Sequence, residues 1–205
     1  MKKAVKKEKV EQVKIPPIDF RTVRITLVGE TPLLVHRFSE KSKTEIEEKH
    51  AQKAKNKKGA RDPLAEFKAS LYPLPGKKNK YGMPTSGIKN CAVSACRFVE
   101  GFAMTQAKGA FHVLDNGTGL TEIQGSAPVM DERIVRIGGF KKIATPRYRA
   151  RFDDWAVTFD VKYNQGVISA EQILNLYENA GFSIGLCEYR PEKGGNLGMF
   201  KVQRA

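Results

Sequence analysis

Cysteine and histidine are scarce in this chain, and their spacing argues against two kinds of site. The 205 residues include 3 cysteines (Cys91, Cys96, Cys187) and 3 histidines (His36, His50, His112). An odd cysteine count without a CxxC pair argues against a disulfide framework, and neither residue type has the spacing of a closed zinc site. We expect free, packed thiols and no cofactor.

Long apolar runs are also missing. No segment approaches the roughly 18 apolar residues of a membrane-spanning helix, and the basic start MKKAVKKEKVEQVKIPP has no apolar stretch behind it. With 40% hydrophobic residues, the chain can still bury one sizeable core or two small ones. We therefore expect a folded cytoplasmic protein without a membrane partner.

Acidic side chains are outnumbered. The sequence has 22 Asp and Glu against 36 Lys and Arg, a formal net charge of +14. This surplus is larger than solubility requires and attracts a polyanion. Nucleic acid is the expected partner, ahead of an anionic membrane surface.

The pattern along the chain predicts an α+β fold. Residues 1–18 are rich in lysine and predict a flexible basic arm, and a single domain is expected over residues 19–205 with a polar insertion near 39–62. Residues 20–29 and 155–161 alternate like half-buried strands. Helices are expected after Pro84 and after Ser169, the second stopping at Gly181, followed by strands at 182–190 and 199–203. This order favours a ferredoxin-like antiparallel sheet with helices on one face.

A run of basic residues between positions 133 and 151 is the first candidate site. Its cations are Arg133, Arg136, Lys141, Lys142, Arg147, Arg149 and Arg151. On a strand, Arg147, Arg149 and Arg151 share one face, where guanidinium groups could bind phosphates, while Tyr148 on the other face could stack on a base. A solvated, charged edge strand is the alternative interpretation.

A glycine-rich loop, RPEKGGNLG, is the second candidate. Arg190 and Lys193 stand beside Gly194 and Gly195, and a loop of this kind lets backbone N–H groups approach a phosphate. A tight turn between two strands explains the glycines equally well. The loop matches neither a P-loop nor a dinucleotide-binding pattern.

Three segments resemble the RAMP superfamily, the ferredoxin-like proteins of CRISPR effector complexes whose backbone subunits line up along guide RNA. They are VRITLVGETPLLVHRF, YGMPTSGIKNCAVSACRF and FSIGLCEYRPEKGGNLGMFKV. The resemblance implies a RAMP-like and RRM-like sheet, with Ser86 and Lys89 of the middle segment as donors to an RNA backbone. The segments RYRARFDDW and GLCEYRPEKGGNLGMFKV also resemble parts of small phage and prophage proteins.

These observations favour a non-enzymatic protein that coats single-stranded RNA or DNA as a multimer. Three alternatives stay open at this point. One is a single-strand annealing protein, one is a metal-independent endoribonuclease that uses His36 with a nearby Lys or Tyr, and one is a structural or inhibitory protein that binds an acidic protein partner.

Overall fold

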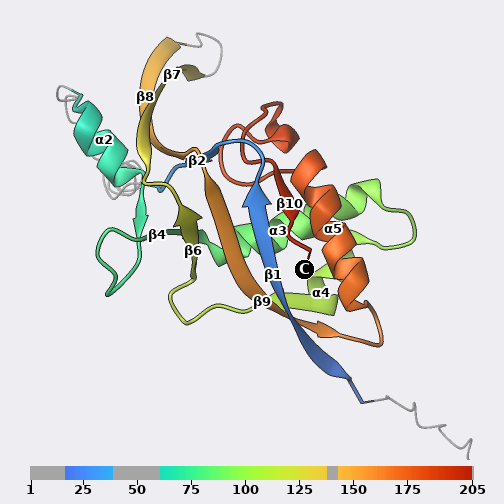
Figure 1. Ribbon diagram of the computed structural model, residues 1–205. Helices are drawn as coiled ribbons and strands as arrows, with labels where there is room; N and C mark the ends of the chain where they lie inside the picture. Colours follow the sequence, from blue (N-terminus) through green and yellow to red (C-terminus); the bar gives the residue numbers. More distant parts are fainter. Residues whose placement is uncertain (1–16, 39–60, 138–142, 205) are drawn as a thin grey trace, which may run out of the picture.

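The computed structural model describes residues 17–38, 61–137 and 143–204 (Figure 1). The basic arm expected at 1–18 and the polar insertion expected near 39–62 lie largely outside these ranges, as do Lys141 and Lys142. Everything below concerns the described residues.

A seven-stranded antiparallel sheet forms the centre of the fold (Figure 1). Its strands follow the order β10-β1-β9-β6-β4-β3, and β5 also pairs with β9. Their bounds are β1 (Phe20–Gly29), β3 (Tyr72–Pro73), β4 (Tyr81–Pro84), β5 (Phe111–Val113), β6 (Leu120–Gly125), β9 (Trp155–Asn164) and β10 (Phe200–Val202). The predicted strand at 20–29 is confirmed as β1.

The two faces of this sheet differ because side chains alternate along each strand. On β1 and β9, Ile25 and Phe159 are buried and oppose each other in the register. The opposite face is polar: the Arg24 guanidinium donates to Asp160 at 2.8 Å. The buried face therefore holds the core, and none of the helices in the described ranges covers the polar face.

The helices pack on the apolar face of the sheet. They are α3 (Thr85–Ala95), α4 (Met104–Ala110) and α5 (Ala170–Ser183). Helix α2 (Pro63–Ala69) lies apart from them, beside β8. Two short 3₁₀ turns are η1 (Cys96–Phe98) and η2 (Pro191–Lys193). If β1, β6, β9 and β10 are numbered 1 to 4 in chain order, they lie side by side in the sheet in the order 4-1-3-2. Helix α3 follows the first of these strands, and α5 connects the last two. This is the ferredoxin-like arrangement that the sequence predicts. No helix of the described ranges is long and apolar enough to cross a membrane.

A second sheet of three strands extends beyond the first. It joins β2 (Leu33–Val35), β8 (Ile143–Phe152) and β7 (Val129–Ile137) in the order β2-β8-β7. Strands β7 and β8 form a long hairpin that projects from the main sheet, with α2 lying against β8 (Figure 1). The backbone N–H of Ala150 donates to Ser70 Oγ at 2.8 Å, which fixes β8 to the end of α2.

Two predictions near the C-terminus are wrong. Helix α5 begins with the expected Ser169 cap but runs through Gly181 to Ser183. Gly181 is required for packing, because a Cβ atom there would lie 1.8 Å from the Phe200 carbonyl oxygen. Residues 184–190 form no strand, because the backbone of Cys187 and Tyr189 has positive φ (61° and 55°), which interrupts an extended run.

The hydroxyl of Tyr177 is buried under the sheet without a hydrogen-bond partner among the described residues. A buried polar group without a partner costs about 1–3 kcal/mol. We therefore expect Tyr177→Phe to raise the free energy of unfolding by about 1 kcal/mol, measured by urea denaturation. A decrease of similar size would mean that the hydroxyl has a partner in solution.

Candidate nucleic-acid interface

Four arginines gather on one face of the β7–β8 hairpin, which we call the arginine face: Arg133, Arg147, Arg149 and Arg151. Directly opposed residues of an antiparallel pair share a face, and the register sets Arg133 opposite Arg147, and Asp131 opposite Arg149. The carboxylate of Asp131 is buried and lies 2.6 Å from Arg133 Nε and 3.3 Å from Arg151 Nη1. The predicted alternation of arginines with Tyr148 and Ala150 thus holds in the register.

Two other described residues of the basic run do not join this face. Tyr148 and Arg136 lie on the opposite side of the hairpin, where the Tyr148 hydroxyl donates to Glu132 at 3.2 Å. Tyr148 is therefore not positioned to stack on a base that is held by the arginine face.

Two of the arginines have an unused buried donor. Arg149 is 8% exposed, and the Nε atoms of Arg147 and Arg149 are buried without a hydrogen-bond partner among the described residues. Arg149 Nη1 lies 3.6 Å from Glu188. A guanidinium N–H that is buried and unpaired is costly, and an anionic oxygen would satisfy it.

A groove of about 280 Å³ lies beside the arginine face. One wall is helix α3, with Gly87, Asn90 and Ser94, and the other is the segment 184–192. His36, which follows β2, and Tyr72 on β3 also line the groove. The middle and final RAMP-like segments of the sequence therefore meet at this groove.

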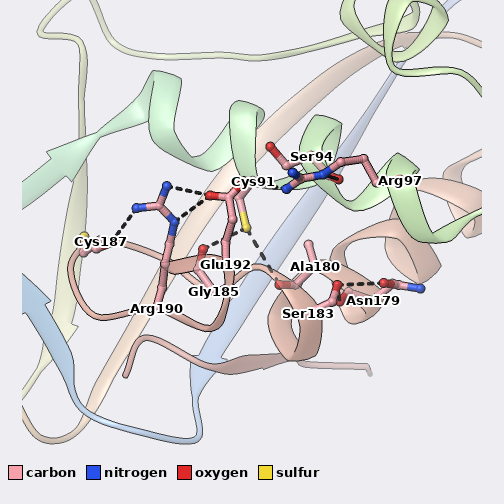
Figure 2. Close-up of polar contacts among 10 residues, drawn as sticks. All are labelled: Cys91, Ser94, Arg97, Asn179, Ala180, Ser183, Gly185, Cys187, Arg190 and Glu192. Carbon is pink, nitrogen blue, oxygen red and sulfur yellow. Dashed lines mark hydrogen bonds and ion pairs between the residues drawn. The ribbon is translucent and has the colours of Figure 1, made fainter. Parts of the chain in front are cut away.

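Polar contacts hold the two walls together (Figure 2). The Cys91 thiol of α3 lies 3.2 Å from the carbonyl oxygen of Gly185, to which it donates. Arg190 and Arg97, on opposite sides, donate to Glu192 at 2.6 Å and 2.5 Å. Burial raises the pKa of Cys91, so this thiol stays protonated and serves packing. The groove is thus a fixed feature of the fold.

The groove segment has a strained backbone. Cys187 and Tyr189 have positive φ without being glycine, and each such residue costs about 1–3 kcal/mol and persists only where its surroundings impose it. The Arg133 guanidinium lies over the Tyr189 ring, with its Cζ atom 5.3 Å from the ring centroid. Glu188 N donates to the Leu34 carbonyl at 3.0 Å. The strained segment is held between the arginine face and β2, which places Glu188 at the junction of the groove and the arginines.

The glycine-rich loop folds as a tight turn with internal hydrogen bonds. The N–H groups of Gly194 and Gly195 already donate to Pro191 and Arg190 carbonyls, so they are not free for a phosphate. A Cβ at Gly195 would lie 1.8 Å from the Tyr189 carbonyl oxygen. This geometry favours the tight-turn alternative, in which the glycines allow the loop to pack on the groove segment. Lys193 lies within this turn and is exposed.

Helix α3 directs its two expected donors differently. Ser86 is exposed near its start. Lys89 points away from the groove, because its Nζ donates to the Lys108 carbonyl at 2.8 Å and lies 3.1 Å from His112 Nδ1. Burial lowers the pKa of Lys89. The α3 residues that line the groove are Gly87, Asn90, Cys91 and Ser94, of which Asn90 and Ser94 were not singled out from the sequence.

His36 is electrostatically coupled to the arginine face. Its Nδ1 lies 3.9 Å from Glu188 Oε1. Burial lowers the pKa of His36, and Arg149 and Arg147 lower it further, whereas Glu188 opposes the shift. The imidazole is therefore neutral at physiological pH.

The lowered pKa of His36 predicts a pH-dependent stability with a defined sign. The unfolded chain, in which this histidine has its ordinary pKa of 6.5, takes up the proton more readily than the folded one. The His36 contribution to stability is therefore complete above about pH 6.5 and falls as the pH drops below that value. We expect His36→Gln to reduce the loss of stability between about pH 7 and pH 5, measured by urea denaturation at each pH. If stability fell with pH to the same extent in the two proteins, the lowered pKa of His36 would be contradicted.

Comparisons with known proteins support this fold. No protein-family model matches the chain, and no curated protein matches it. Its fold is similar to a chain in the cryo-EM structure of the type III-B Cmr-beta bound to cognate target RNA, with a TM-score of 0.56, 14% identity, and coverage of 90% of this chain and 59% of that one. A second match is the crystal structure of Cmr6 from Pyrococcus furiosus, with a TM-score of 0.44, 9% identity, and coverage of 91% and 100%. The chain has a RAMP-like fold and spans about three fifths of the Cmr-beta chain.

Proposed function

We propose that this protein binds single-stranded RNA, with the phosphates on the arginine face and the strand running past the groove. The observation that carries the proposal is the pair of buried Nε donors of Arg147 and Arg149, which have no hydrogen-bond partner among the described residues. They lie on a face with two further arginines and next to a groove large enough to admit part of a ligand. Phosphate oxygens are the acceptors that guanidinium groups bind most readily in nucleic acids.

The choice of RNA over DNA, and of a multimer over a single copy, draws on the comparisons. The Cmr-beta structure contains cognate target RNA, and the RAMP resemblance implies copies that lie side by side along a strand. The polar face of the main sheet is a poorer platform, since its central arginine, Arg24, is already paired with Asp160. A role in phage nucleic-acid metabolism, suggested by two segments of the sequence, stays a prediction.

Titration of a labelled single-stranded RNA tests this proposal. Six to ten phosphate contacts would lower the affinity by roughly 10³- to 10⁵-fold between about 50 and 200 mM salt. A DNA oligonucleotide of the same sequence should bind more weakly. The mass of the saturated RNA complex should correspond to several protein copies per strand. A shallow salt dependence would contradict phosphate binding, and equal affinity for DNA would contradict the preference for RNA.

A second candidate, metal-independent RNA cleavage, is favoured by the presence of His36 and Tyr72 in one groove. Neutral His36 would take the proton of a ribose 2′-hydroxyl as that oxygen attacks the adjacent phosphorus. Burial raises the pKa of Tyr72, so its hydroxyl stays protonated and could give a proton to the leaving 5′-oxygen, which leaves a 2′,3′-cyclic phosphate. His36→Ala should then abolish cleavage and preserve binding; RNA that stays intact with the unaltered protein would exclude this candidate.

A further inference from the structure

We propose that the groove is a nucleotide pocket that takes one unstacked base, with a preference for guanine, while the attached phosphate binds Arg147 and Arg149. This inference rests on the proposed function and assigns the groove a base-binding role within it. The groove has about 280 Å³ of space, and it is bounded by two walls that are pinned together.

The end of the groove near His36 fits a phosphate. His36 and Glu188 line the groove, and Arg149 Nη1 lies 3.6 Å from Glu188, so the Arg149 guanidinium lies close to that end. Arg147 lies two residues away on the same face of β8. Arg149 is buried, and its Nε has no partner among the described residues. A phosphate oxygen would give this donor, and that of Arg147, a charged acceptor.

The walls of the groove fit a planar base. Met83, Pro84 and Leu186 supply apolar surface, and the Tyr72 ring stands among the lining residues. Gly87 leaves the α3 wall open, because a Cβ there would meet no atom within 4 Å. Gly87 lies in the first turn of α3, where glycine is a poorer helix former than alanine by up to about 1 kcal/mol, and no contact among the described residues requires glycine at this position. Space for a ligand accounts for it.

Glu188 selects the base. It lines the groove, and its contacts with His36 and Arg149, at 3.9 Å and 3.6 Å, are longer than hydrogen bonds. A carboxylate only accepts hydrogen bonds, and it pairs best with two adjacent donors. Guanine presents N1–H and N2–H side by side, whereas adenine, cytosine and uracil each place an acceptor next to the donor. The other carboxylate, Glu192, is already bound by Arg190 and Arg97.

Calorimetric titration of the full chain with GMP, AMP, UMP and inorganic phosphate tests the pocket. GMP is expected to bind at least about fivefold more tightly than AMP or UMP, since a bidentate base contact discriminates by roughly that factor or more. Glu188→Gln should remove this preference without abolishing nucleotide binding. Equal binding of the three nucleotides would overturn the role of Glu188.

A matched pair of glycine variants tests the location. Gly87→Gln places a side chain in the groove and should abolish GMP binding. Gly109→Gln, on α4, also meets no atom within 4 Å of its Cβ, lies outside the groove, and should leave GMP binding unchanged. If GMP fails to bind while single-stranded RNA still binds, the pocket is overturned and the proposed function stands. If neither ligand binds, the proposed function fails as well.

Discussion

Replacing Arg147 and Arg149 together by glutamine is expected to lower the affinity for single-stranded RNA by about 100-fold or more at low salt. Each charge-assisted hydrogen bond contributes roughly 1.5–3 kcal/mol, and about 1.4 kcal/mol is a factor of ten. Losing two phosphate contacts should also reduce the slope of log affinity against log salt by about 1.4. Fluorescence anisotropy of a labelled RNA at several salt concentrations measures both effects.

The chain offers a matched control for this charge change. Arg21 and Arg24 lie on β1, are exposed, and pair with Asp19 and Asp160. The double glutamine variant of these residues removes the same charge from β1, away from the arginine face, and it should change the affinity only slightly. If both double variants weaken binding equally, general charge and not the arginine face would account for it. Thermal melts confirm that both variants are folded.

Gly195→Ala is expected to lower the free energy of unfolding by about 1–3 kcal/mol or more, because overpacking of a filled site has that cost. The new methyl would lie 1.8 Å from the carbonyl oxygen of Tyr189, and backbone on both sides cannot yield as a flexible side chain would. Since Tyr189 belongs to the groove segment, RNA affinity should fall too.

Gly87→Ala serves as the opposite case. Its Cβ would enter open space, and alanine favours a helix by up to about 1 kcal/mol over glycine. Urea denaturation should therefore show a small gain in stability for Gly87→Ala and a clear loss for Gly195→Ala. A Gly195→Ala protein as stable as the unaltered chain would mean that the close approach of loop and groove segment is not present in solution.

Local periodicity was enough to predict much of the fold. The alternation at 20–29 gives β1, and Ser169 marks the start of α5. Three members of the arginine face were also predictable, because Arg147, Arg149 and Arg151 alternate within β8 and strand geometry places them on one side without reference to the rest of the chain. Arg133 lies on β7 and joins them only through the pairing of β7 with β8.

The groove could not be predicted in the same way. It joins His36, Tyr72, one side of α3 and the segment 184–192, which are distant in sequence and meet only through tertiary packing. The direction of Lys89 depends on its contact with the carbonyl of Lys108 in α4, a helix that the sequence pattern did not indicate. The end of α5 was missed because Gly181 has a packing role that a local pattern does not distinguish from a helix stop.

Cross-linking of RNA that contains 4-thiouridine, followed by mass spectrometry of the attached peptides, tests the central claim most directly. We expect cross-links in the groove segment 184–192 and on β8, with Tyr189, which contacts Arg133, and Tyr72, which lines the groove, as the aromatic acceptors. Cross-links on the polar face of the main sheet, for example at the exposed ring of Phe20, with none at the groove, would contradict the claim.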